Sequence, residues 1–340
     1  MHLRILLTIG FLVIVSSCRT GVYAPTEVPT IPPLPSATPL AKLALKPDVE
    51  LERQIAEIAK EAKGKVGVAA VLLETGDAAF LNADQQFPMQ SVYKLPIAMA
   101  VMDQVRLGKL DLDEKVGVTK DDFVRAGMRS PLRDENPTGR EFTVRELIRL
   151  SLVESDGTAS DVLLRLVPPT DVQSHLTQIG IHDMKVVNTE KEIGKDWETQ
   201  YRNWSTPMAS AELLRWLCRA ASEWGSGYGC NAVVPVDEPT SNAEKMGGFL
   251  HTMAVSNSGA KRLKAQLPNG TVVAHKTGTG GTLNGITAAT NDVGIIFLPG
   301  GKHLAIAVFV SDSPADEKTR EAVIARISKA VWDRWHGSNR

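Results

Sequence analysis

The chain has 340 residues, of which 43% are hydrophobic and 23% charged, a composition typical of a globular protein with a sizeable core. This composition excludes a collagen-like, a disordered or a polytopic membrane protein. The 38 basic and 39 acidic residues give a net charge of -1, so the chain lacks an overall positive field that would bind a nucleic acid. Three cysteines are too few for a disulfide scaffold and form no Cys-x-x-Cys pair of a zinc or redox site.

Residues 1–18 have the pattern of an export signal. His2 and Arg4 precede an apolar run at 5–15, and small residues follow it before Cys18. The run is too short to span a bilayer, which favours a signal peptide. The small residues before Cys18 resemble the cleavage site of bacterial lipoproteins, in which that cysteine becomes lipidated. We therefore expect residues 1–17 to be removed and Cys18 to anchor the exported protein, with ordinary cleavage or an uncleaved anchor as the alternatives.

A tether is predicted next, over residues 18–47. Seven of the 19 prolines lie between positions 25 and 47, with Thr, Ser and Ala among them. Such a segment favours extended backbone that cannot bury a core. The folded domain is therefore expected to span residues 48–340.

Hydrophobic patterns predict the elements of this domain. A helix is expected up to residue 64, followed by strands at 65–73 and 78–81 that a Gly-Asp turn joins. Further helices are expected at 91–107, 146–153, 158–166 and 209–221. Strand patterns return at 271–275, 285–290, 293–298 and 303–310, separated by Gly-rich or Asn-Asp turns, and a last helix is expected at 315–335.

This order of elements predicts an α/β fold of the α+β sandwich type. Strands near both ends of the domain would form one five-stranded antiparallel sheet flanked by helices, with an inserted all-helical subdomain. Residues 48–85 and 266–340 would make the α/β half, and residues 86–265 the helical half.

Metal and nucleotide chemistry are disfavoured. The seven histidines form no His-x-x-x-His or His-x-His pattern, and the chain has no Walker lysine and no glycine-rich dinucleotide motif after a strand. We therefore expect no cofactor.

A candidate nucleophile lies in the sequence Ser-Val-Tyr-Lys at 91–94. The hydroxyl of Ser91 and the amine of Lys94 would project from one face of the helix, and a serine nucleophile needs such a base. The backbone N–H groups at a helix start also favour negative charge that develops on a carbonyl under attack. The same spacing recurs at Ser258 and Lys261, so spacing alone does not decide.

Two more motifs follow it along the chain. Ser-Asp-Gly at 155–157 opens a predicted helix, where it could be no more than a cap. Lys-Thr-Gly-Thr at 276–279 ends a predicted strand, where it could be only a turn. A lysine and hydroxyls at such a place would also bind a substrate carboxylate.

In this order, the three motifs resemble those of the class A serine β-lactamases, in particular the PER-like and Bacteroidetes branch, and more loosely those of the penicillin-binding transpeptidases. The segments 87–98, 274–279, 291–296 and 306–310 extend the resemblance. It implies a monomeric enzyme that hydrolyses a small β-lactam through a covalent acyl-enzyme on Ser91 without a metal. The alternatives are a D,D-peptidase and a penicillin-binding sensor lipoprotein that does not hydrolyse.

The resemblance also implies roles for single residues. Lys94, or Glu190 through a water molecule, would deprotonate Ser91, and Ser155 would pass a proton to the lactam nitrogen. The residues that would hold the substrate carboxylate are Lys276, Thr277, Gly278, Thr279 and Arg262. Arg262 could equally be a surface charge.

The base that hydrolyses the acyl-enzyme would come from a loop between the second and third motifs. The sequence Glu-Lys-Glu-Ile-Gly at 190–194 resembles that loop. We assign Glu190 as the base, with Glu192 as the second candidate and a pair of solvated surface carboxylates as the alternative.

Three positions depart from the family pattern. Gly157 and Gly194 stand where the family usually has asparagines that bind the substrate and the hydrolytic water, and Arg129 replaces an aromatic residue before a Ser-Pro pair. We expect activity to fall severalfold to tenfold for a lost hydrogen bond of about 0.5 to 1.5 kcal/mol. Cys218 and Cys230 are either thiols or a disulfide formed in an oxidising compartment.

Overall fold

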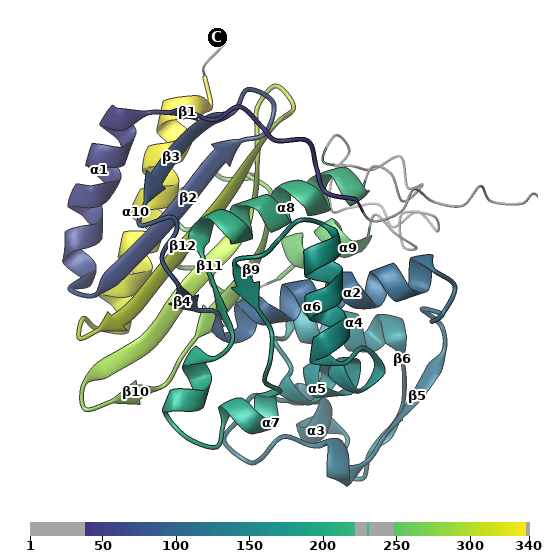
Figure 1. Cartoon of the computed structure of the whole chain (residues 1–340). Coiled ribbons are helices and arrows are strands. Elements are labelled where there is room, and N and C mark those ends of the chain that lie inside the picture. Colours follow the sequence, from purple (N-terminus) through teal and green to yellow (C-terminus); the bar gives the residue numbers. More distant parts are fainter. Residues whose placement is uncertain (1–37, 222–229, 231–247, 257, 338–340) are drawn as a thin grey trace, which may run out of the picture. The chain divides into compact units, whose positions relative to one another are not determined.

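The computed structural model of the chain describes residues 38–221, 230, 248–256 and 258–337 (Figure 1). The predicted signal peptide, Cys18 and the first part of the predicted tether lie outside the described residues. Within the described ranges, none of the helices is long and apolar enough to cross a membrane.

One sheet organises the fold, with the strand order β1-β3-β2-β12-β11-β10 and with β9 paired to β11 (Figure 1). Its five longer strands pair antiparallel, as predicted. They are β2 (Lys65–Leu72), β3 (Asp77–Leu81), β9 (Val273–Thr279), β11 (Ile286–Leu298) and β12 (Lys302–Ser313). Two short strands widen the sheet beyond the prediction: β1 (Lys46–Pro47) lies parallel to β3, and β10 (Thr282–Leu283) lies antiparallel to β11.

The prediction of two strands at 285–290 and 293–298 was wrong, because β11 is continuous across both. Asn291 and Asp292 suggested a turn, yet both side chains are fully buried inside the sheet. The Asn291 amide donates to Pro88 O at 2.8 Å, and the Asp292 carboxylate accepts from the His275 ring at 2.8 Å. Because the NH2 group of Asn291 and the carboxylate of Asp292 find partners within the protein, the strand does not need to leave the sheet.

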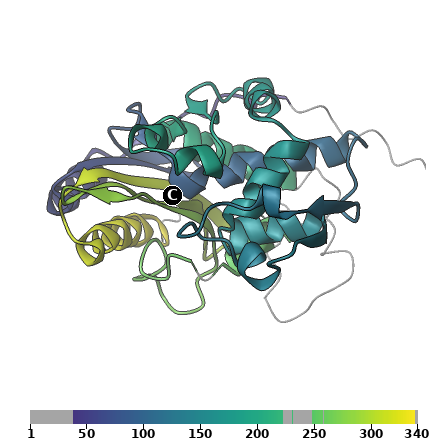
Figure 2. The ribbon, with the colours of Figure 1, turned by 90° about the horizontal axis from the view of Figure 1, so that it is seen from below.

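Helices cover both faces of the sheet. The first helix, α1 (Val49–Ala59), and the last, α10 (Glu317–Trp335), share one hydrophobic cluster with alternate residues of β12 such as Ile306. The intervening residues of β12, such as Phe309, belong to a second cluster with the helical half. Figure 2 shows α10 on one side of the sheet and the helical half on the other.

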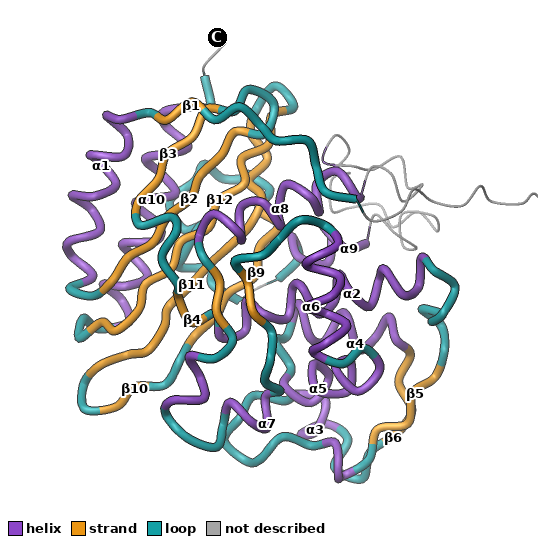
Figure 3. The backbone as a smooth tube through the Cα atoms, in the orientation of Figure 1, coloured by secondary structure: helices purple, strands orange, loops and turns teal. Residues whose placement is uncertain are grey.

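The helical half is built from α2 (Lys94–Arg106), α3 (Pro131–Glu135), α4 (Val144–Val153), α5 (Gly157–Leu166), α6 (Pro169–Gln178), α7 (Glu190–Ile193), α8 (Pro207–Ala221) and α9 (Gly248–Ala254). It is not entirely helical, because β5 (Lys115–Val118) and β6 (Arg140–Thr143) pair antiparallel within it (Figure 3). The short strands β4 (Phe87–Pro88), β7 (Met184–Lys185) and β8 (Trp204–Ser205) form a third sheet.

Part of the predicted tether lies against the folded domain. The Trp216 ring nitrogen on α8 donates to Thr38 O at 3.2 Å, and Lys46 and Pro47 form β1. Helix α8 also carries Cys218, which forms a disulfide with Cys230. The chain is therefore attached to the domain from Thr38 onward, ten residues before the predicted boundary at residue 48.

Candidate active site

A cavity of about 1060 Å³ lies at the junction of strand β9 and the helical half. It gathers seven of the predicted site residues on its wall: Ser91, Lys94, Ser155, Glu190, Arg262, Thr277 and Thr279. The other two, Lys276 and Gly278, belong to β9, where each is a sequence neighbour of Thr277. Residues that lie up to 188 positions apart in the chain thus meet at one site.

Ser91 sits in a single 3-10 turn, Gln90–Tyr93, that leads into α2. Gln90, directly before it, has a φ of 48°, which is unfavourable for a residue with a side chain. The Gln90 side chain is held by a bond from its amide to Gln200 O at 3.2 Å. Backbone strain of this kind persists only where the surrounding structure enforces it. Here it places Ser91 at the N-terminus of α2.

Lys94 connects the nucleophile segment to the opposite wall. Its side chain is 1% exposed, and its ammonium contacts Glu190 Oε1 at 2.9 Å and donates to Ser155 O at 2.7 Å. A buried ammonium without such partners would be costly. The contact with Glu190 therefore joins two groups that can exchange a proton.

The Ser-Asp-Gly motif serves two purposes. Asp156 is the helix cap that the sequence allowed, since its carboxylate accepts from Ala159 N at 2.8 Å and Leu132 N at 2.7 Å. Ser155 faces the cavity with a φ of 54°, and its hydroxyl accepts from Lys276 Nζ at 3.1 Å. The Lys94 ammonium lies 3.5 Å from the same hydroxyl.

Lys276 is fully buried at the centre of this network. Burial, and after it the ammonium of Lys94, lowers the pKa of Lys276 to about 7. Ser155 thus lies between two lysines, one of which can lose its proton close to neutral pH.

The two glutamates of the 190–194 segment have different positions. Glu192 belongs to the cap of α7, where its carboxylate accepts from Thr189 N at 2.9 Å. Glu190 points to Lys94 in the cavity. Its backbone N–H donates to Asp161 Oδ1 at 2.7 Å, and burial raises the pKa of Asp161 to about 6. Asp161 was not among the predicted site residues, because its only signal is that it is an acidic residue within the apolar helix α5.

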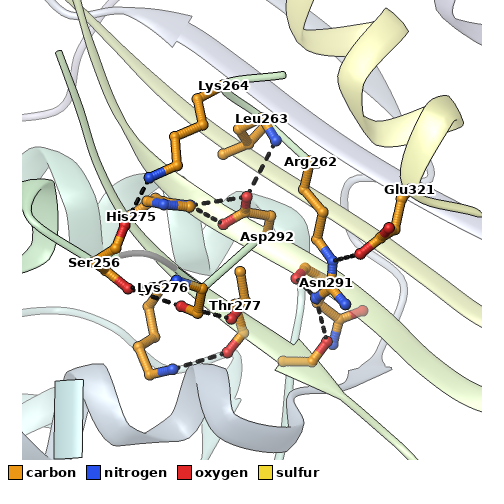
Figure 4. Close-up of polar contacts among 12 residues, drawn as sticks. Ser256, Arg262, Leu263, Lys264, His275, Lys276, Thr277, Asn291, Asp292 and Glu321 are labelled. Carbon is orange, nitrogen blue, oxygen red and sulfur yellow. Dashed lines mark hydrogen bonds and ion pairs between the residues drawn. The ribbon is translucent and has the colours of Figure 1, made fainter. Parts of the chain in front are cut away.

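Arg262 is not a surface charge, since only 4% of it is exposed. Its guanidinium donates to the backbone oxygens of Gly278 at 3.1 Å and Asn291 at 2.9 Å and to Thr279 Oγ1 at 2.8 Å. It also contacts Glu321 at 3.2 Å (Figure 4). Arg262 therefore lies beside the hydroxyls at the end of β9.

Ser258 also lies at this end and was missed as a site residue. The Thr277 hydroxyl donates to its oxygen at 3.2 Å. The sequence drew attention to Ser258 only as part of a repeated Ser-x-x-Lys spacing.

The three departures from the family pattern lie on the cavity wall or next to it. A Cβ on Gly157 would lie 3.4 Å from Glu190 Cγ, and one on Gly194 would lie 2.8 Å from Met128 Sδ. Arg129 pairs with Glu154 at 3.1 Å. Gly157 and Gly194 thus leave this part of the wall without the side-chain amides of the family pattern, and Gly194 is the more crowded of the two positions.

For metal binding, one group of His, Cys, Asp and Glu in the described part of the chain has ligand atoms close enough together: Cys218, Cys230 and His303. The two sulfurs of this group are joined in the disulfide, away from the cavity.

Comparisons with known proteins agree with this geometry. The family described as the β-lactamase enzyme family matches residues 50–226 and 240–335. The chain is 36% identical to β-lactamase VEB-1 of Pseudomonas aeruginosa over 83% of its own length and 89% of that protein. The chain belongs to the class A β-lactamase family. It is therefore a β-lactam hydrolase of the serine type.

Two further relatives support the assignment. Extended-spectrum β-lactamase PER-1 of Pseudomonas aeruginosa is 36% identical over 83% of this chain and 86% of that protein. The crystal structure of a β-lactamase from Chitinophaga pinensis is 38% identical, with a TM-score of 0.75 over 84% of this β-lactamase and 99% of that chain.

Proposed function

We propose that this β-lactamase hydrolyses penicillins or cephalosporins through an acyl-enzyme on Ser91, with Glu190 as the base of its hydrolysis. The observation that carries the proposal is the position of Lys94 in the cavity that Ser91 lines: its ammonium lies 2.9 Å from Glu190 Oε1 and 3.5 Å from the Ser155 hydroxyl. A carboxylate, an amine and a serine hydroxyl are thereby close enough to pass a proton, and Ser91 lies on the same cavity wall.

In the acylation step, Ser91 attacks the lactam carbonyl while Lys94, or Glu190 through a water molecule, takes the hydroxyl proton. The backbone N–H groups of Ser91 and Thr279 stabilise the oxyanion, at about 3 kcal/mol for each donor. Ser155 relays a proton to the departing nitrogen, since its hydroxyl lies 3.1 Å from Lys276 Nζ and 3.5 Å from Lys94 Nζ. The bond between the carbonyl carbon and the lactam nitrogen breaks as the ester with Ser91 forms.

Deacylation separates the proposed enzyme from its alternatives. A D,D-peptidase or a sensor would also acylate its serine, but a β-lactamase needs a base to activate water. Glu190 lines the cavity beside Ser91, whereas Glu192 is engaged in a helix cap. This placement favours turnover over a trapped acyl-enzyme.

The test is turnover of a chromogenic cephalosporin. We expect sustained hydrolysis by the full chain, a loss of at least about a thousandfold in Ser91→Ala, and accumulation of the acyl-enzyme in Glu190→Ala. The matched control Glu192→Ala should keep activity within about tenfold.

Intact-protein mass would detect the acyl adduct. A single stoichiometric burst by the unmodified enzyme would overturn the proposal in favour of the sensor. Accumulation of the acyl-enzyme in Glu192→Ala instead would reassign the base.

We also propose that the enzyme is exported and held at a membrane by a lipid on Cys18. The apolar run at 5–15 and the small residues before Cys18 support it. So does the disulfide between Cys218 and Cys230, because such bonds persist in oxidising compartments.

A further inference from the structure

A buried histidine and carboxylate lie directly behind the carboxylate-binding end of the cavity and take no part in the mechanism above. His275 on β9 and Asp292 on β11 are both fully buried. The His275 Nδ1 atom lies 2.8 Å from one Asp292 oxygen and 2.9 Å from the other (Figure 4).

The pair faces the described residues 256 and 258–264, called segment 256–264 below, which include Ser258 and Arg262. The Asp292 carboxylate accepts from the backbone N–H of Leu263 at 3.2 Å, next to Arg262. Gly259, with a φ of 69°, packs so closely that a Cβ there would lie 2.3 Å from Thr277 Cγ2 and 3.5 Å from Asp292 Oδ2. The segment therefore rests on β9 and β11 at the position of Asp292.

A second contact closes the segment on itself. The Lys264 ammonium donates to Ser256 O at 2.6 Å, and the Ser256 hydroxyl lies 2.8 Å from that of Ser258. Because Thr277 donates to Ser258, these bonds run without interruption from Lys264 to the cavity wall.

The contact between the two side chains orients the His275 ring. Its Nδ1 atom faces both Asp292 oxygens, so Nδ1 is the ring nitrogen that donates to the carboxylate. A carboxylate held in this way acts on the cations around it.

Those cations belong to the site. Burial lowers the pKa of both Lys264 and Lys276, and the Asp292 carboxylate opposes the lowering at each. The charged groups that act on Lys276 from the elements around it are Lys94 of α2, Glu190 of α7, Asp292 of β11 and Arg262. Lys94 and Arg262 disfavour its charge, whereas Asp292 and Glu190 favour it.

We propose that Asp292, oriented by His275, is the positioning residue of the carboxylate-binding end: it ties segment 256–264 to the sheet and so holds Ser258 and Arg262 beside the hydroxyls of β9. This role rests on the proposed function, in which Arg262, Lys276 and the hydroxyls of β9 bind the substrate carboxylate. It acts on acylation and leaves the hydrolytic step at Glu190 unchanged.

The test compares acylation of full-chain variants by benzylpenicillin and by its methyl ester, followed by intact-protein mass. Samples are quenched with acid within the first turnover, so the adduct is detected before deacylation, and failure of the proposed hydrolysis does not obscure the result. Asp292→Asn keeps a carbonyl for Leu263 N–H but removes the charge. We expect its acylation by benzylpenicillin to fall at least about tenfold and that of the ester to change less than about threefold.

The pH profile is the second measurement. In Asp292→Asn the pKa of Lys276 should fall, because an anion that favoured its charged form is gone, and the alkaline limb of acylation should move down by at least about half a pH unit. The rate of deacylation should stay within about twofold.

Two His275 variants and one distant pair complete the design. His275→Gln keeps a donor to Asp292 and should retain acylation within about threefold. His275→Leu removes this donor but leaves the carboxylate, so it should lower acylation by benzylpenicillin as Asp292→Asn does, without the shift of the alkaline limb. The control is Glu74→Gln. Glu74 Oε1 contacts the ring of His303, a buried residue of β12, at 2.6 Å, so it also forms a carboxylate–histidine pair. Neither residue lines the cavity. Glu74→Gln should lower the melting temperature without changing the pH profile or the ratio of acylation by benzylpenicillin to acylation by its methyl ester.

If Asp292→Asn and His275→Leu only lose stability, as the control does, the pair is structural and the proposal is wrong. If Asp292→Asn does not fold, the two His275 variants decide by the same measurements. Equal acylation of the free acid and the ester by the unmodified enzyme would instead contradict the carboxylate-binding role in the proposed function.

Discussion

Gly157 leaves the cavity wall beside Glu190 without a side-chain amide. Its position at the start of α5 is helical, and its N–H donates to Arg129 O at 2.9 Å. An added Cβ would meet Arg129 O and Val124 Cγ1 at 3.3 Å and Glu190 Cγ at 3.4 Å, so small shifts suffice to admit a side chain. The position is therefore open to change at little cost in stability.

We expect Gly157→Asn to fold and to gain activity toward substrates with an acylamino side chain. A new hydrogen bond of about 0.5 to 1.5 kcal/mol should raise kcat/KM roughly three- to tenfold for benzylpenicillin. The control substrate is 6-aminopenicillanic acid, which has no acyl group and should show no gain. An equal rise of kcat/KM for both substrates would mean that the amide introduced at position 157 contacts other groups of the enzyme and not the acylamino side chain of the substrate.

At the residue scale, motifs singled out candidate residues that the fold brings together, and burial decided that Arg262 is not a surface charge. Ser91, Lys94 and Lys276 could be proposed as site residues because their motifs are encoded in local spacing. The setting of Arg262 could not, since its four partners come from β9, β11 and α10. Asp161 and Asp292 remained hidden for the same reason, because a single acidic residue in an apolar element has no local signature.

Helices α5 and α7 are linked by one carboxylate. Asp161 on α5 accepts from Glu190 N at 2.7 Å and Lys191 N at 3.0 Å, and it thereby fixes the first turn of α7. Burial raises its pKa from 3.8 to about 6 in the folded protein. The folded state therefore binds this proton more tightly than the unfolded chain does, and ionisation of Asp161 at neutral pH opposes folding.

Asp161→Asn removes the buried charge and keeps an amide oxygen for Glu190 N–H, but its NH2 group replaces the oxygen that accepts from Lys191 N–H. The net gain in the free energy of unfolding at pH 7.5 should therefore be about 1 kcal/mol. The gain is complete above the folded pKa near 6 and should disappear below about pH 4, where Asp161 is protonated in both states. Thermal unfolding at pH 4, 6 and 7.5 measures it. A gain of the same size at every pH would show that ionisation is not its cause.

At the element scale, periodicity was informative where one side of an element is apolar. Helices α1, α4, α5, α8 and α10 and strands β2 and β12 lie where the pattern predicted them, within a few residues. It failed at β11, because Asn291 and Asp292 look like a turn when their distant partners Pro88 and His275 are unknown. Short strands such as β1, β5 and β10 depend on pairing with distant segments, which their own sequences do not reveal.

At the scale of the whole molecule, the cavity is separate from residues 38–47, which lead into the domain. Two hydrophobic clusters stabilise opposite faces of the sheet, and the cavity is lined by residues between Gln90 and Glu321. Residues 38–47 contact α8 and β3 instead. In the described part of the chain, no residue before Gln90 lines the cavity. Changes in the segment that precedes the domain should therefore not alter catalysis.

This separation gives a test of the proposed anchor. Cys18→Ser removes the thiol that would carry the lipid anchor. In cells that express the full chain, we expect activity to move from the membrane fraction to the soluble fraction, while kcat/KM measured after detergent extraction changes less than about twofold. Replacement of the neighbouring Ser17 by Ala controls for general effects on export. If the serine variant at position 18 stays with the membrane as the unmodified chain does, an uncleaved apolar segment and not a lipid holds the enzyme there.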